Sequence, residues 1–131
     1  MYADDGIFAE LSERVIGCSF AVANALGVGF LEKVYENSLA MELRAHGMAV
    51  DQQVAMTVRY RGASVGQYTA DLVVAGTIVV EVKATTAFDP AHFAQCRNYL
   101  KATGLQLCLL INFGAPRVAI KRVIMTNPQA R

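Results

Sequence analysis

The chain has 131 residues, of which 54% are hydrophobic and 18% are charged, and its formal net charge is +1. This composition is unlike that of a disordered or low-complexity chain, and the length suits a single folded domain, expected to cover residues 1–131. The near-neutral charge excludes a strongly basic nucleic-acid binder, so any such contact must use a local patch. No apolar run approaches the length of a membrane span, so none is expected.

The three cysteines, Cys18, Cys96 and Cys108, are odd in number and show no metal-binding or paired spacing. This disfavours a disulfide scaffold and a zinc ribbon. It favours a reducing compartment, and the start of the chain has no basic segment of the kind that opens a secretory signal. A cytoplasmic location is therefore expected.

The first third of the chain is predicted to be helical. Apolar residues recur with helical spacing over residues 7–18, and a break at Gly27-Val28-Gly29 separates them from a second helical stretch that Gly47 ends. The expected apolar face of the second helix consists of Phe30, Leu31, Val34, Leu39 and Leu43.

Strands and one further helix follow. Three β-rich runs are expected at residues 50–60, 64–74 and 78–84, and they are apolar enough for a sheet covered on both faces. Asp89 as N-cap and Pro90 at the first helical position begin a helix that Gly104 ends. Strands are then expected at residues 105–113 and 118–125. The order predicts an α/β fold with a mixed sheet flanked by helices.

Two acidic residues, Asp71 and Glu81, lie within apolar strands, and Lys83 shares a strand face with Glu81. A carboxylate in such a place is costly unless it is paired or binds a metal. A three-residue loop at 75–77 would pair Asp71 with Glu81 on one face, whereas a two-residue loop would send the two acids to opposite faces. We expect the three-residue loop, because it gathers the polar groups.

Two carboxylates about 4 Å apart repel by roughly 4 kcal/mol at an effective dielectric constant near 20. Protonation of one acid, Lys83 alone, or a divalent cation could neutralise them. Oxygen ligands suit Mg²⁺ or Mn²⁺. A cation between two acids with a lysine alongside suits phosphodiester hydrolysis. The simpler alternative is a buried Glu81–Lys83 pair with no catalysis.

Two more segments carry candidate residues. Gln95 and Tyr99 are four residues apart on one helix face and are available to approach the acids, although a plain amphipathic helix would show the same pattern. Glu32, one turn before Tyr35, could supply a third carboxylate or could form an ordinary surface ion pair.

Together these residues resemble the PD-(D/E)XK nuclease superfamily. The closer similarity is to its small GxxExxY-type family, through the segment Gly29-Phe30-Leu31-Glu32-Lys33-Val34-Tyr35, and the likeness runs roughly over residues 15–123. The resemblance implies a restriction-endonuclease-like α-β-β-β-α-β core. It also implies roles for the following residues: Asp71 and Glu81 as metal ligands with the Val82 carbonyl, Lys83 as the catalytic lysine, Glu32 as the first-helix glutamate, and Gln95 and Tyr99 lining the active site.

The leading hypothesis is a nuclease that depends on Mg²⁺ or Mn²⁺ and acts on nucleic acid, with DNA as the expected substrate. The alternative is a catalytically silent module of the same fold that binds nucleic acid or a protein. The high hydropathy of so short a chain also suggests a homodimer, which is compatible with both.

Overall fold

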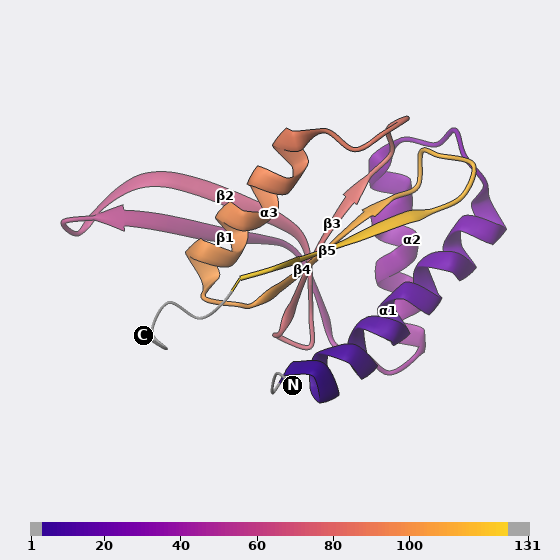
Figure 1. Cartoon of the computed structure of the whole chain (residues 1–131), viewed down its shortest axis with the longest axis horizontal. Helices are drawn as coiled ribbons and strands as arrows, with labels where there is room; N and C mark the ends of the chain where they lie inside the picture. The colour runs from indigo at the N-terminus through magenta and orange to yellow at the C-terminus, as the bar shows by residue number, and fades with distance from the viewer. Residues whose placement is uncertain (1–3, 126–131) are drawn as a thin grey trace.

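The computed structural model describes residues 4–125 and shows one twisted sheet between two helical layers (Figure 1). The helices are α1 (Asp4–Leu26), α2 (Glu32–Ala45) and α3 (Pro90–Thr103), and the strands are β1 (Val50–Tyr60), β2 (Ala63–Val74), β3 (Ile78–Lys83), β4 (Leu107–Asn112) and β5 (Ala119–Ile124). The strands lie in chain order, and only β3 and β4 pair in parallel, joined through α3. The expected α/β fold with a mixed sheet is confirmed. No helix within the described residues is long and apolar enough to cross a membrane.

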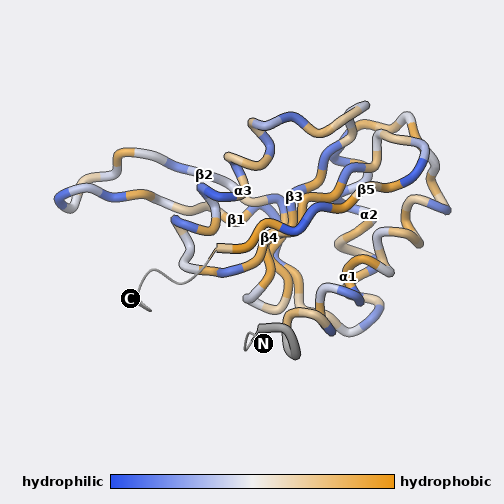
Figure 2. Tube along the Cα trace, viewed as in Figure 1, coloured by the Kyte–Doolittle hydropathy of each residue, from blue (hydrophilic) through white to orange (hydrophobic). Residues whose placement is uncertain are grey.

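Each face of the sheet has its own core. On one face α1 and α2 pack on Leu72, Val80 and Leu109, and on the other α3 packs on Val79 and Leu110. Figure 2 shows the most hydrophobic chain in the central strands, and all six residues of β4 are buried. A parallel pair covered on both faces explains why β3 is apolar from Ile78 to Val80 and β4 from Leu107 to Ile111.

The turn between α1 and α2 is built on two glycines and a tyrosine. Gly27 and Gly29 both have positive φ, as the expected break requires. The Tyr35 hydroxyl donates to the Gly27 carbonyl and accepts a hydrogen bond from the Phe30 amide, and its ring stacks on Phe113 at 4.9 Å. The tyrosine therefore ties the turn to the end of β4.

The predicted apolar face of the second helix is confirmed for Leu39 and Leu43 and wrong for the three residues before them. The helix begins at Glu32, and Phe30, Leu31 and Val34 are 50, 81 and 38% exposed. The buried face consists of Tyr35, Glu36, Leu39, Ala40 and Leu43. Glu36, a polar residue, faces the core, whereas the hydrophobic pattern predicted that nearby apolar residues would do so.

The residues predicted to begin and end α3 are confirmed. The Asp89 carboxylate accepts a hydrogen bond from the Ala91 amide at 2.8 Å, and His92 Nδ1 accepts one from the Asp89 amide at 3.1 Å. Gly104 ends the helix in the left-handed conformation. His92 thus contributes to the cap of the helix.

The β1–β2 hairpin is longer than the rest of the sheet and extends beyond it as a two-stranded arm (Figure 1). Val50 and Leu72 belong to the core under α1 and α2, whereas Met56 and Ala70 belong to the core under α3. The hairpin therefore twists between these pairs. Gln53, which lies at this twist, has a φ of 53°, which is uncommon for a residue other than glycine.

Candidate active site

The turn at 75–77 sets the register that brings Asp71 and Glu81 together. Val74 pairs with Ile78 and Leu72 with Val80, so the next positions along the two strands are Asp71 and Glu81. The paired positions of β2 and β3 end at Leu72 and Val80. The three-residue loop expected from the sequence is therefore the one that forms.

Side chains continue the contact between the two strands where their pairing ends. The Asp71 amide donates to Glu81 Oε2 at 2.9 Å, and the Val82 amide donates to Asp71 Oδ2 at 2.8 Å. Each carboxylate is thus held by the main chain of the opposite strand. The backbone of the two strands therefore fixes the positions of both acids, although they are ten residues apart in the sequence.

Burial is the main reason why ionisation of both carboxylates is disfavoured, and the charge of Asp71 adds to this effect at Glu81. Glu81 is 2% exposed, and burial, followed by the charge of Asp71, raises its pKa to about 9. Burial also raises the pKa of half-buried Asp71, while the hydrogen bond from the Val82 amide opposes that rise. Positive charge near the pair would therefore stabilise it, and Lys83 lowers both pKa values but does not restore the ordinary ones.

Lys83 and the α3 residues lie on the same side as the acids. Lys83 Nζ donates to Gln95 Oε1 at 3.0 Å, so α3 holds the ammonium group of the last residue of β3. Tyr99, one turn beyond Gln95, is 3% exposed. Burial and then the charges of Glu81 and Asp71 raise the pKa of Tyr99 above its ordinary value, which keeps the hydroxyl protonated. The structure thus brings together five of the side chains that the sequence singled out: Asp71, Glu81, Lys83, Gln95 and Tyr99.

Glu32 is not joined to this group. It is exposed at the first residue of α2, and no hydrogen bond or ion pair connects its side chain to the rest of the described chain. Its charge is the weakest of the influences that raise the pKa of Asp71, behind that of Glu36.

Glu36 and Gln53 are polar neighbours of the site that sequence reasoning missed. Glu36 is 4% exposed and accepts hydrogen bonds from Gln52 and from Gln53, the latter at 3.0 and 3.1 Å. The same Gln53 Nε2 lies 3.4 Å from Asp71 Oδ1. A chain of polar contacts therefore links α2 to Asp71. The adjacent glutamines in a predicted strand are the signal that could have indicated it.

Asn112, the last residue of β4, holds the segment that follows Lys83. Its Oδ1 accepts from the amides of Thr85 and Gly114, and its Nδ2 donates to the Thr85 carbonyl at 2.8 Å. A Cβ at Gly114 would collide with the backbone of Thr85. Close backbone packing therefore fixes the chain between Lys83 and α3, and the polar residue at the end of an apolar run was its only sequence signal.

The oxygen atoms of Asp71, Glu81 and the Val82 carbonyl are suitable ligands for a hard divalent cation. The Val82 amide faces Asp71, and the N–H and C=O of one strand residue point to the same neighbouring strand, so the Val82 carbonyl also faces β2. The next carbonyl, that of Lys83, faces the other way and accepts from the Phe113 amide. Two carboxylates and one carbonyl are oxygen donors of the kind Mg²⁺ and Mn²⁺ prefer. Within residues 4–125, no three or more His, Cys, Asp or Glu side chains group as a metal site, so the carboxylate pair is what this part of the chain offers.

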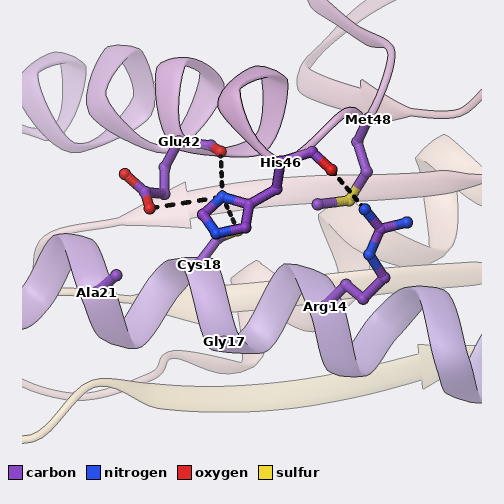
Figure 3. Close-up of a pocket in the computed structure, with 7 residues that line it drawn as sticks. All are labelled: Arg14, Gly17, Cys18, Ala21, Glu42, His46 and Met48. Carbon is purple, nitrogen blue, oxygen red and sulfur yellow. Dashed lines mark hydrogen bonds and ion pairs between the residues drawn. The ribbon is translucent and has the colours of Figure 1, made fainter.

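A pocket of about 320 Å³ lies elsewhere, between α1 and α2 (Figure 3). There His46 Nδ1 lies 2.9 Å from the Glu42 carbonyl oxygen and 3.7 Å from Cys18 Sγ, and Arg14 donates to the His46 carbonyl. Burial raises the pKa of Cys18, so its thiol is not an activated nucleophile. These contacts join the two helices, and the pocket contains none of the predicted site residues.

The chain is an α/β domain in which Asp71, Glu81 and Lys83 lie together on the α3 side of a mixed sheet. The sequence profile described as the PD-(D/E)XK nuclease superfamily matches residues 9–123, and the chain belongs to that superfamily. Members that are nucleases typically use divalent metal ions. Among curated proteins no sequence matches the chain.

Solved structures that match the chain include the following two. The crystal structure of SSO0001 superposes with a TM-score of 0.59 at 17% identity, over 76% of this chain and 52% of that one. The chain thus spans about half the length of that protein, and the likeness concerns the fold. An alkaline exonuclease (LHK-Exo) from Laribacter hongkongensis matches at 14% identity over 86% of this chain and 78% of that one, with a TM-score of 0.48 that carries no argument about this chain.

Proposed function

We propose that the protein is a nuclease that hydrolyses phosphodiester bonds of DNA with Mg²⁺ or Mn²⁺. The observation that carries this proposal is the fixed pair Asp71 and Glu81, in which burial and the charge of Asp71 oppose the ionisation of Glu81 and the ammonium group of Lys83 favours it. A cation bound there would supply Lewis-acid polarisation of the phosphate and lower the pKa of a coordinated water. Asp71, Glu81 and the Val82 carbonyl are its proposed ligands.

The remaining residues act around the scissile phosphate. We assign Lys83 the role of stabilising negative charge on the phosphate, since its ammonium group is positioned by Gln95 Oε1. Gln95 therefore orients the lysine. Tyr99, kept protonated by its buried and negatively charged surroundings, lines the site as a hydrogen-bond donor.

Glu32 is proposed as an outer carboxylate that adds negative potential near Asp71, in line with its modest effect on that residue's pKa. The GxxExxY-type family remains the proposed branch of the superfamily. The positive φ of Gly29 and the buried Tyr35 support this branch, because both residues of the motif have structural roles in the turn. A cytoplasmic location is supported by three buried free cysteines, and a homodimer by the exposure of Phe30 and Leu31.

A cleavage assay tests the proposal. Linear and nicked DNA, and RNA, are incubated with Mn²⁺ or Mg²⁺ and with the wild type, Lys83→Ala or the control Arg117→Gln, which changes an exposed arginine in the β4–β5 connection. We expect metal-dependent cleavage of DNA, lowered about 100-fold or more by Lys83→Ala and unchanged by the control. Equal cleavage by wild type and Lys83→Ala would reject this mechanism. Metal-independent binding without cleavage would support the silent binding module instead.

A further inference from the structure

The charges of this nearly neutral chain are unevenly distributed. Residues 1–51 contain eight acidic and three basic side chains, whereas residues 52–131 contain three acidic and nine basic ones. The acids of the second part are Asp71 and Glu81 in the site and Asp89 at the start of α3. Because α1 and α2 come from the acidic part and cover one face, the basic residues between positions 52 and 125 belong to the sheet, its connections and the α3 layer.

The arm formed by residues 55–69 of β1 and β2 carries positive charge and no negative charge. No Asp or Glu occurs from residue 52 to residue 70. At its tip Arg59 and Arg61 are exposed, and Tyr60 is 65% exposed with the Arg61 guanidinium 5.8 Å from its ring centroid. Within the described residues neither arginine forms an ion pair. Figure 2 shows the tip as hydrophilic chain at the far end of the hairpin.

The base of the arm is in contact with the candidate active site. Tyr68 packs edge-to-face on Tyr99 with ring centroids 6.0 Å apart, and Gln53 at the root lies 3.4 Å from Asp71 Oδ1. From Gln53 to Arg61 the strand rises over about 25 Å at roughly 3.3 Å per residue. That distance corresponds to about 7 or 8 base-pair steps of B-form DNA.

The α3 surface continues this basic side of the molecule. Arg97 and Lys101 are exposed, one turn apart on the helix that also supplies Gln95 and Tyr99 to the site. From residue 90 to residue 131 the chain contains no Asp or Glu. The exposed outer face of α3 therefore adds positive charge to the same layer of the molecule as the site.

We propose that the arm is a distal clamp for double-stranded DNA: Arg59 and Arg61 bind backbone phosphates about 7 or 8 base pairs from the scissile phosphate, and Tyr60 packs beside them. This inference rests on the proposed function and names a binding surface beyond the catalytic group. A self-complementary contact between two copies would bring identical arginine-bearing tips together, which disfavours the arm as a dimer interface.

The test uses duplexes of two lengths, about 5 base pairs (kept paired by a closing hairpin loop) and about 24 base pairs, bound in EDTA so that no cleavage occurs. Fluorescence anisotropy over a salt series gives the Kd and its salt dependence. We expect Arg59→Gln/Arg61→Gln to weaken binding of the long duplex about tenfold and to reduce the slope of log K against log salt by about 2, at roughly 0.9 per phosphate contact. The short duplex cannot reach the tip from the site, so its affinity should be unchanged.

The matched comparison is between two single variants, Arg61→Gln and Arg117→Gln. Each removes one charge from an exposed arginine, but only Arg61 lies on the arm. A loss for Arg61→Gln alone, and only on the long duplex, supports the clamp. The clamp would be overturned if Arg61→Gln bound the long duplex as tightly as the wild type, or lost affinity equally for both lengths. It would also be overturned if sedimentation showed that Arg61→Gln changes the oligomeric state of the protein. Failure of the wild type to bind either duplex would instead reject the proposed function along with the clamp.

Discussion

Asp71 and Glu81 are each anchored by the backbone of the other's strand: the Asp71 amide donates to Glu81, and the Val82 amide donates to Asp71. This reciprocal arrangement keeps both carboxylates where β2 and β3 cease to pair. It also places buried Glu81 beside half-buried Asp71, an electrostatic cost that either a proton on Glu81 or a nearby positive charge can relieve.

Stability in the absence of metal should fall as pH rises. The pKa of Glu81 is raised to about 9 in the fold and is near 4.3 in an unfolded chain, so the folded state holds the extra proton between these values. The free energy of unfolding should then decrease on the order of 1 kcal/mol per pH unit in this window and level off above it. Glu81→Gln, which cannot ionise, should remove much of this slope.

Urea unfolding in EDTA from about pH 5 to about pH 9 measures this dependence. Glu13→Gln, which changes an exposed acid of α1, serves as the control and should keep the wild-type slope. A wild-type stability that rises across this range would show that Glu81 is ionised in the metal-free fold.

Divalent cations should raise the melting temperature of the wild type. A ligand that binds only the folded state stabilises it by about 2.7 kcal/mol at 100 times its Kd. Asp71→Asn should remove most of the shift, because it removes one of the two carboxylate ligands. Asp51→Asn changes an exposed acid of β1 and should retain it.

Differential scanning fluorimetry with increasing Mn²⁺ measures these shifts. If Asp71→Asn and Asp51→Asn respond to Mn²⁺ as the wild type does, the cation binds elsewhere.

Gln95→Ala should lower kcat for cleavage about tenfold while KM changes little. The substitution leaves Lys83 in place but removes the oxygen that holds its ammonium group at 3.0 Å. Its effect should therefore be smaller than that of Lys83→Ala. Asn98→Ala changes an exposed residue of the same helix and should leave both constants unchanged. Steady-state kinetics on a linear duplex distinguishes these cases, and a Gln95→Ala enzyme with normal kcat would contradict the positioning role.

Gly114→Ala should destabilise the protein by about 3 kcal/mol or more, because the added Cβ would meet backbone atoms of Thr85, which cannot rotate away as a side chain could. Gly66→Ala offers a contrast, since a Cβ there meets only Val58 Cβ at 4.0 Å. That variant should be neutral or slightly stabilising, because alanine costs less entropy than glycine in a strand. Equal urea midpoints for the two variants would show that the approach of Gly114 to Thr85 is not rigid.

The acid pair could be predicted from the sequence because it depends on parity alone. A loop of three residues at 75–77 places Asp71 opposite Glu81, and spacing by two places Lys83 on the same face. The caps of α3 were equally readable, since Asp89, Pro90 and Gly104 act through local geometry.

The contacts from α2 could not be predicted in the same way. The link from Glu36 to Asp71 runs through Gln53, whose backbone is left-handed, a conformation that the residue type does not indicate. The hydrophobic pattern placed Leu39 and Leu43 correctly on the buried face of α2 but also included Phe30, Leu31 and Val34, whereas packing on the sheet selects a face that includes Glu36. Tertiary packing, unlike strand parity, is not fixed by local spacing.

Anomalous diffraction from a crystal soaked in Mn²⁺ tests the central claim most directly. We predict a peak about 2.2 Å from carboxylate oxygens of both Asp71 and Glu81, with the Val82 carbonyl as a further ligand. Density that shows no cation at the pair, with both carboxylates still bound to the amides of the opposite strand, would contradict the account.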